Sequence, residues 1–278
     1  MRKFKRILKK ILLYVAVITT CTILFFPMYW MFNTSLAPQQ QTFIYPPRLL
    51  HPNPTLDAYR EVLTNRPILQ WMTNSLYIVL LVTAATLLTA IFAGYSLSRY
   101  RNTGTKSVGA FLLVSRMLPT TLLVIPLFVI MRRLNLINSI YSVALADLVF
   151  VVPFAAWMLK GYFDSIPREL EEAAWIDGCN RVQSMFWIVL PLAVPGIAAS
   201  LLFGAILAWD EYVFARTFIT SENAWTVTVG LASFKGEYVT YWNEIMAASL
   251  IGTLPIVIVF LIVERYLIGG LTAGALKG

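Results

Sequence analysis

Long apolar runs separated by short polar stretches dominate the pattern along the chain. Six runs are long enough to cross a bilayer core about 30 Å thick, which takes roughly 20 helical residues at about 1.5 Å per residue. Lipid offers no hydrogen-bond partners, so every backbone N–H and C=O in the bilayer must be paired within the protein, as in a helix or a closed barrel. These runs lack the alternation of barrel strands, so they predict an all-α integral membrane protein. The six expected transmembrane helices cover residues 11–36, 71–98, 107–131, 139–160, 190–215 and 246–268.

Prolines are frequent within or at the edges of these runs. Each proline lacks a backbone N–H, frees a carbonyl and can kink a helix, which suits a bundle that lines a cavity. The alternative is that membrane helices simply tolerate proline better than soluble helices do. Both interpretations stay open for Pro27, Pro119, Pro126, Pro153, Pro191, Pro195 and Pro255.

The polar stretch between the fourth and fifth runs predicts two short helices that meet at a bend. Ser165 can cap a helix, Pro167 fits its first turn, and acidic residues follow near the positive end of the helix dipole. Gly178 permits the backbone turn that ends such a helix, and Asn180 can cap the next one. We therefore expect a structured loop over residues 161–190.

Composition agrees with a membrane protein and indicates no soluble domain. Hydrophobic residues make up 58% of the chain and charged residues 13%, whereas charged residues are roughly a quarter of an ordinary soluble domain. We expect residues 1–278 to form a single transmembrane domain. The chain has one histidine, His51. Of its two cysteines, Cys21 lies in the first apolar run and Cys179 in the polar stretch 161–190. Neither a metal site, a catalytic triad nor a disulfide framework is expected.

The basic residues indicate the orientation of the chain. Six of them precede the first apolar run, which is longer than the roughly 7–15 residues of a secretory signal, so we interpret it as an uncleaved first span. With the N-terminus in the cytoplasm, basic residues outside the spans are roughly twice as frequent on the cytoplasmic side. The formal charge of +8 therefore indicates an N-in, C-in topology with residues 161–190 in the cytoplasm, not a nucleic-acid-binding surface.

A string of acidic and small residues lies in this expected cytoplasmic loop. Glu172-Ala173-Ala174 is followed after three residues by Gly178 and, after nine more, by Ile188-x-Leu190-Pro191. The string resembles the EAA loop of ABC importer permeases, which docks on their ATPase subunits. Small side chains let a partner approach, and an acid can contact a basic residue of that partner. The resemblance implies ATPase-coupling roles for Glu172, Ala173, Ala174, Asp177 and Gly178; the alternative is an amphipathic loop on the bilayer surface.

No phosphate-binding loop of the form G-x-x-x-x-G-K-[ST] occurs in the sequence. Gly104-Thr105-Lys106-Ser107 lacks the second glycine and its spacing. We therefore expect that this polypeptide is not an enzyme and carries no catalytic residue and no cofactor. ATP and Mg²⁺ are expected on partner ATPase subunits.

The resemblance extends over about residues 70–278. It includes Met117-x-Pro119, Ile125-Pro126-Leu127 and the stretch from Glu264 to Gly278. These residues are similar to those of MalG-like inner-membrane permease subunits of carbohydrate ABC importers, in the binding-protein-dependent transport permease family. In that family the C-terminal tail inserts between the ATPase subunits, which implies docking roles for Leu271, Thr272, Gly274 and Lys277. By composition alone, residues 269–278 are a frayed terminus.

The same resemblance implies a location and partners. It places the chain in the inner membrane of a bacterial or archaeal cell, importing a sugar or oligosaccharide of unidentified type. The implied partners are a second homologous permease, two nucleotide-binding ATPase subunits, an extracytoplasmic solute-binding protein and membrane lipid. Aromatic residues of the outer stretch 216–245 are expected to contact the binding protein or to form a membrane-interface belt: Trp225, Phe234, Tyr238, Tyr241 and Trp242.

Charged residues in or beside the spans are further candidates. Arg116 and Asp147 lie at similar expected depths, where a charge is costly unless it is paired or faces water. They are expected to form a buried pair or to face the translocation cavity. Asp210 and Glu211 follow Trp209 near the outer end of the fifth run and are expected to line an outward cavity, since sugars bind acceptors beside aromatic faces.

Two other functions compete with an importer subunit. A proton- or ion-coupled secondary transporter of a polar solute also needs membrane carboxylates and broken helices. A structural membrane protein is the third possibility. Neither explains the EAA-like string.

Overall fold

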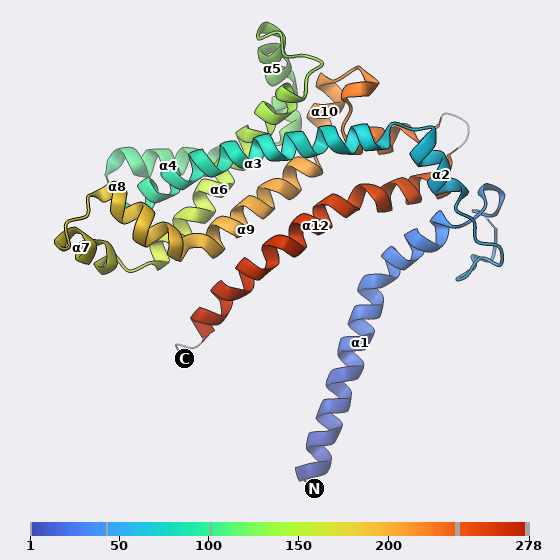
Figure 1. The fold of residues 1–278 in the computed structure, drawn as a ribbon, viewed down its shortest axis with the longest axis horizontal. Helices are drawn as coiled ribbons and strands as arrows, with labels where there is room; N and C mark the ends of the chain where they lie inside the picture. The colour runs from blue at the N-terminus through green and yellow to red at the C-terminus, as the bar shows by residue number, and fades with distance from the viewer. Residues whose placement is uncertain (1, 43, 101, 237–239, 276–278) are drawn as a thin grey trace. The chain divides into compact units, whose positions relative to one another are not determined.

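Helices form most of the described structure (Figure 1). The computed structural model describes residues 2–42, 44–100, 102–236 and 240–275, and the side chains within them except those of 2–4, 116 and 268–275. The described α-helices are α1 (Arg2–Ser35), α2 (Asp57–Thr64), α3 (Ile68–Arg99), α4 (Thr103–Arg116), α5 (Thr120–Arg133), α6 (Ile140–Ser165), α7 (Glu169–Ile176), α8 (Arg181–Ser184), α9 (Leu190–Trp209), α10 (Val213–Phe218), α11 (Val227–Ser233) and α12 (Trp242–Ala275).

Short turns of other helix types complete the elements. Two 3₁₀-helices cover Gln39–Gln41 and Glu222–Ala224, and a π-helix covers Met185–Val189. The described residues contain no strand, only an isolated bridge between Lys235 and Thr240. The prediction of an all-α protein is confirmed.

Within the described residues, five helices are long and apolar enough to cross a membrane. A sixth span is present if the bent pair α4 and α5 counts as one broken span. The five single spans are Lys5–Ser35, Ile68–Arg99, Ile140–Ser165, Arg181–Trp209 and Trp242–Leu267. The chain is therefore a multi-pass membrane protein, whereas the predicted N-in, C-in orientation stays a prediction.

The third predicted span, residues 107–131, is not one continuous helix. It is divided into α4 and α5, and the chain bends by 104° between them. Pro119 stands at the N-cap of α5 in an extended conformation. Because proline has no backbone N–H and disfavours the helical conformation of the residue before it, α4 ends ahead of Pro119.

The fifth span begins and ends earlier than the predicted 190–215. Its helix runs from Arg181 to Trp209 and includes the π-helical turn. Asp210 is the C-cap of α9, and the Glu211 carboxylate accepts hydrogen bonds from backbone N–H groups of the next helix, α10. A capped new helix therefore replaces the last turn that the apolar pattern predicted.

The chain divides into two compact units, and α12 contributes to both. The first comprises Met1–Ile68 and Leu231–Gly252. Inside it, the Ser35 and Tyr59 hydroxyls share a hydrogen bond of 2.7 Å, and the Asn243 amide donates to the Ala37 carbonyl at 3.3 Å. The most apolar part of α1 has no buried residue, as expected for a helix whose side chains face lipid.

The second unit comprises Leu69–Gly230 and Thr253–Gly278, and α3, α6 and α9 form its centre. Small residues let these helices approach closely. A Cβ on Gly94 would lie 2.9 Å from the Ala156 carbonyl oxygen, and one on Gly204 would lie 2.8 Å from Val151. Close packing through small residues is typical of membrane helices, because lipid supplies no hydrophobic drive between them. This close packing positions the loop that carries the candidate site.

Candidate coupling site

The loop between α6 and α9 contains the two short helices that the sequence predicted. Helix α7 ends where Gly178 adopts a positive φ of 93°, a conformation that glycine reaches without strain. The N–H of Cys179 then bonds to the Ala174 carbonyl at 2.9 Å. Asn180 caps α8 through a reciprocal box with Gln183. The bend between α7 and α8 is therefore built from short-range contacts.

The start of α7 differs from the prediction. Ser165 does not cap it: Ser165 is the last residue of α6, and its hydroxyl donates to the Tyr162 carbonyl at 2.7 Å. Helix α7 begins at Glu169, and its N-cap residue Arg168 makes no side-chain cap bond. The predicted acids do occupy the first turn, where the helix dipole favours negative charge.

Glu171, which the sequence analysis did not single out, anchors α7 to the membrane helices. Its carboxylate forms an ion pair with Arg99 at the end of α3, and the side chains are 3% and 9% exposed, respectively. The Tyr95 hydroxyl donates to the other carboxylate oxygen at 2.6 Å. Both oxygens therefore have a partner, which is what a buried charge requires.

Arg99 also reaches α6, so three elements meet at one side chain. Its guanidinium donates to the Phe163 carbonyl at 2.8 Å and to the Ile166 carbonyl at 3.3 Å. Arg168 reinforces the junction by donating to the Ser98 carbonyl at 2.8 Å. The planar guanidinium can serve several acceptors at once, so α3, α6 and α7 are fixed to one another here.

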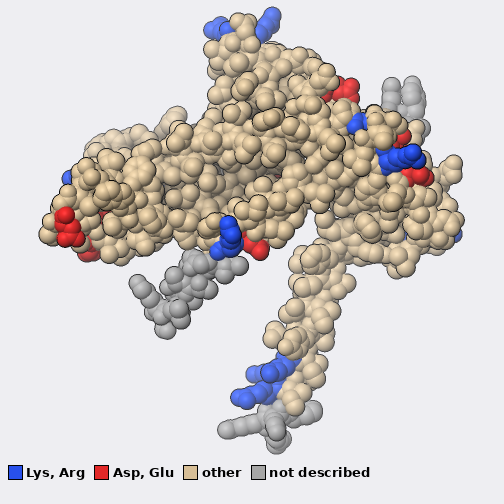
Figure 2. Space-filling model, in the orientation of Figure 1, with Lys and Arg blue, Asp and Glu red and all other residues tan. Residues whose placement is uncertain are grey.

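The opposite face of α7 is open. Glu172, Ala173 and Ile176 are exposed, and the Ile176 side chain keeps 88% of its surface accessible. Asp177 and Gly178 are exposed as well. Acidic side chains form a visible patch at α7 on an otherwise largely uncharged surface (Figure 2). An apolar residue beside an acid, both exposed, suits a protein partner.

Ala174 is placed differently from Ala173. It is 6% exposed and faces its own chain, so of the two small residues only Ala173 lies open to a partner in this structure. The predicted coupling role of Ala174 stays a prediction. A small side chain fits this buried position.

A hollow of about 240 Å³ lies between α7, α8 and the end of α3. The Arg181 guanidinium stands 5.1 Å from the centre of the Trp175 ring, and the indole N–H of Trp175 donates to Ser184 at 2.9 Å. These contacts join the two short helices. The lining residues are Tyr95, Arg99, Tyr100, Arg168, Glu171, Glu172, Trp175 and Arg181.

The predicted pair of Arg116 and Asp147 receives no support from geometry. Arg116 ends α4, but its side chain lies outside the described residues. Asp147 is 4% exposed in α6, and within the described part of the chain its Oδ2 atom has no hydrogen-bond partner. Its pairing, or exposure to the translocation path, stays a prediction.

Glu211 has a local role that the sequence did not predict. Its two carboxylate oxygens accept from the N–H groups of Phe214 at 2.7 Å and Ala215 at 2.8 Å. Burial raises the pKa of this carboxyl, and the backbone N–H groups act in the opposite direction. Partial burial of the Asp210 carboxyl also raises its pKa. The expectation that these two acids line an outward cavity stays a prediction.

The outer aromatic residues divide into internal and exposed groups. Trp225 packs against Trp71 with ring centres 6.0 Å apart, and Phe234 is 2% exposed. Tyr241 and Trp242 keep 39% and 40% of their surface. Tyr238 lies outside the described residues. Among those described, Tyr241 and Trp242 are exposed and Trp225 is half-buried.

The predicted C-terminal docking residues are described only in part. The backbone of α12 continues as a helix through Leu271, Thr272 and Gly274 to Ala275. The side chains of these residues, and Lys277 altogether, lie outside the described part.

Comparison with known proteins adds independent evidence. Residues 85–272 match the family described as binding-protein-dependent transport system inner membrane component. The sulfoquinovosyl glycerol transport system permease protein SmoH of Agrobacterium fabrum is 35% identical, over 91% of this chain and 89% of that protein. The trehalose/maltose transport system permease protein MalG of Thermococcus litoralis is 37% identical, over 99% of both.

A solved structure shares the fold. It is that of a bacterial ABC transporter involved in the import of the acidic polysaccharide alginate; the match covers 92% of this chain and 95% of that one, with a TM-score of 0.78 and 22% identity. The chain therefore belongs to the family of inner membrane components of binding-protein-dependent transport systems, and it is a multi-pass transport subunit rather than an enzyme.

Proposed function

We propose that this chain is a permease subunit of an ATP-driven importer for a sugar or oligosaccharide. Together with a second related permease, it forms the translocation pathway. The substrate class is supported by the two relatives, whose names specify sulfoquinovosyl glycerol and trehalose/maltose transport. An extracytoplasmic binding protein delivers the solute, which agrees with the description of the family.

The two faces of α7 carry the proposal for coupling. The inner face is clamped to α3 and α6 through Glu171 and Arg99, and the outer face presents Glu172, Ala173 and Ile176. When two ATPase subunits close on ATP and Mg²⁺, a partner that holds the outer face pulls α7. Because α7 is fixed to the ends of α3 and α6, that displacement passes to the membrane helices as a rigid-body movement.

The remaining predicted sites fit the same assembly. Asp177 and Gly178 continue the exposed edge of α7 toward the ATPase. The tail, with Leu271, Thr272, Gly274 and Lys277, reaches between the two ATPase subunits. Deletion of 271–278 is expected to reduce coupled ATP hydrolysis or assembly while membrane insertion persists; full coupled activity of the truncated chain contradicts this role.

Charge reversal on the open face of α7 tests the proposed function. The chain is coexpressed with the neighbouring genes of its operon and reconstituted with a sugar-loaded binding protein. Glu172→Lys is expected to lower binding-protein-stimulated ATP hydrolysis at least about tenfold, because it places a positive charge against a basic partner surface. Asp57→Lys, which reverses the charge of an exposed acid of α2 outside the stretch 216–245, is the control and is expected to leave hydrolysis unchanged.

Two outcomes would overturn the proposal. The first is normal stimulated hydrolysis and transport by Glu172→Lys. The second is solute uptake by the isolated chain in proteoliposomes driven by a proton or ion gradient without ATPase subunits, which identifies a secondary transporter.

A further inference from the structure

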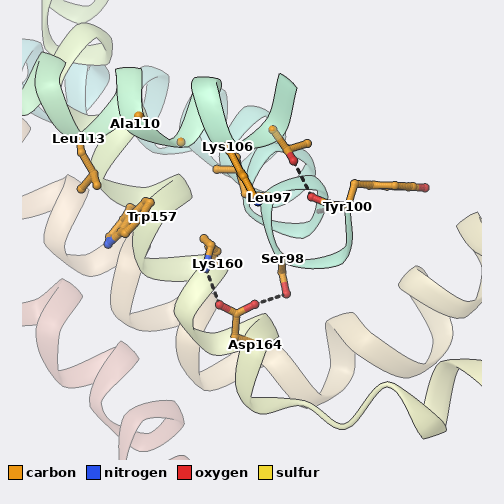
Figure 3. A pocket seen from close by; sticks show the side chains of 11 residues that line it. Leu97, Ser98, Tyr100, Lys106, Ala110, Leu113, Trp157, Lys160 and Asp164 are labelled. Carbon is orange, nitrogen blue, oxygen red and sulfur yellow. Dashed lines mark hydrogen bonds and ion pairs between the residues drawn. The ribbon is translucent and has the colours of Figure 1, made fainter. Parts of the chain in front are cut away.

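A cavity of about 420 Å³ lies at the end of the membrane helices, next to the coupling site and distinct from the hollow beside α7 (Figure 3). The end of α3, the first turns of α4 and the last turns of α6 enclose it, all within the second unit. Its lining residues are Leu97, Ser98, Tyr100, Thr105, Lys106, Gly109, Ala110, Leu113, Trp157, Lys160 and Asp164.

The lining changes from polar to apolar along two helices in the same sense. On α4, Lys106 stands near the helix start, and Leu113 lies about 10 Å further into the apolar run at about 1.5 Å per residue. On α6, Lys160 lies near the helix end, and Trp157 lies one turn deeper. The cavity thus has a charged rim where the helices leave the bilayer and an apolar wall toward its core.

The two lysines at the rim differ in their bonding. The Lys160 ammonium pairs with Asp164 at 2.5 Å and stands 5.4 Å from the centre of the Trp157 ring. The second Asp164 oxygen accepts from the Ser98 hydroxyl at 2.7 Å, so this acid is already engaged. Lys106 is exposed, and among the described residues its ammonium has no acid or hydrogen-bond partner. One positive charge at the rim is therefore uncompensated.

We propose that this cavity binds an anionic phospholipid. The headgroup phosphate contacts Lys106 at the rim, with Lys160 beside it, and an acyl chain lies against Leu113 and Trp157. A phospholipid has a negatively charged headgroup at the membrane surface and apolar chains toward the bilayer core. The cavity has lysines at its rim and an apolar wall toward the core, so the two match in order. Basic pockets between membrane helices at the cytoplasmic side bind anionic headgroups in this way, and the predicted orientation places the rim on that side.

The bound lipid also contacts the support of the coupling site. Ser98 lines the cavity, its hydroxyl accepts from Arg99 at 3.2 Å, and its carbonyl accepts from Arg168. The occupant therefore packs against the residues that hold α7. This inference concerns the membrane rather than the transported solute, so it stands or falls independently of the proposed function.

Lipid retention measures the site directly. The purified chain, alone and with its partner subunits, is reconstituted in nanodiscs with equal amounts of phosphatidylglycerol and phosphatidylcholine, and the lipids it retains are counted by native mass spectrometry. The wild type is expected to retain phosphatidylglycerol in excess. Lys106→Gln is expected to reduce that excess about fivefold, the usual contribution of one basic residue near an anionic membrane surface. Lys106→Arg, which keeps the charge, is the control.

A second variant blocks the apolar part without changing charge. A Cβ on Gly109 would lie 3.5 Å from Leu97 and 3.7 Å from Trp157, so a methyl group fits but a leucine fills the cavity. Gly109→Leu is therefore expected to lose the retained phosphatidylglycerol as well. Equal retention of both lipids by the wild type, or unchanged retention by Lys106→Gln, overturns the proposal. So does displacement of the lipid by inorganic phosphate alone, because the site then recognises a free anion.

Discussion

The two ends of α3 are fixed by different chemistry. At its C-terminal end, Tyr95 and Arg99 bind the buried carboxylate of Glu171 and so hold α7. At its N-terminal end, neutral side chains hold the segment that follows α10: the Asn74 amide donates to the carbonyls of residues 223 and 225, and the Ser75 hydroxyl accepts from the N–H of residue 227. One end depends on a charge pair, and the other on backbone hydrogen bonds.

This difference separates the junction that we propose transmits movement from one that fixes position. A buried ion pair is costly to break by removing one partner, because the remaining charge is left in a poorly solvated place. A neutral hydrogen bond contributes less, and its loss leaves a weaker penalty. We infer that the α7 end is the more rigid attachment in the second unit. Four substitutions test this comparison.

The largest loss of stability is expected for Glu171→Ala. It leaves the buried Arg99 guanidinium without its countercharge and should lower the free energy of unfolding by about 3–5 kcal/mol. The double variant Arg99→Met with Glu171→Met is expected to lose less, because no unpaired charge remains. Thermal unfolding of the purified chain in detergent compares the two. If the double variant unfolds as early as the single one, charge compensation is not the reason for the effect.

A smaller loss is expected for Asn74→Ala at the opposite end of α3. The side chain is 6% exposed and donates at 2.8 and 2.9 Å to two carbonyls, so its removal should cost about 1–3 kcal/mol. Gln70→Ala is the control, since that exposed side chain bonds only to Asn74 itself among the contacts described. A loss as large as that of Glu171→Ala would remove the distinction between the two ends.

A loss of about 1–2 kcal/mol is expected for Gly178→Ala. The space around this glycine is open, so the cost arises from the positive φ of 93° and not from a clash. Gly161→Ala is the matched control, because it also meets open space but lies in the helix α6. Alanine there should raise stability by up to about 1 kcal/mol. Opposite shifts in the unfolding temperature confirm the backbone explanation; equal shifts contradict it.

The smallest effect on stability is expected for Glu172→Gln. This side chain is exposed and makes no ion pair within the described residues, so the free energy of unfolding should change by less than about 0.5 kcal/mol. The same unfolding assay measures it beside Glu171→Ala. A large destabilisation would show that the outer face of α7 also supports the fold, and would leave Glu172 less free to serve a partner.

Much of the fold follows from local pattern. Run length predicted the spans, and the turn residues Gly178 and Asn180 predicted the end of α7 and the cap of α8, because these features depend on neighbouring backbone groups. The sequence showed a proline at position 119, but it did not show that the helix ends there. A proline inside an apolar run can kink a helix or end it, and local sequence does not separate the two outcomes.

The contacts at the candidate site do not follow from local sequence pattern. Glu171 and Glu172 are adjacent acids in the same first turn, and the motif drew attention to the second. The structure buries the first against α3 and leaves the second exposed. Arg99 lies 72 residues away along the chain from its partner Glu171, so no short-range signal connects them. A search for a basic residue at the end of the second span would have suggested the pair, without identifying which acid it binds.

By itself, the sequence determined the membrane class, the approximate spans and the bend between α7 and α8. Each follows from the cost of exposing polar backbone to lipid or from the conformational preference of a single residue. Only the tertiary structure decided which acid is buried, which alanine faces outward and where two lysines meet an apolar cavity. These depend on the packing of α3, α4, α6 and α7, because a side chain's environment is set by neighbours that are distant in the chain.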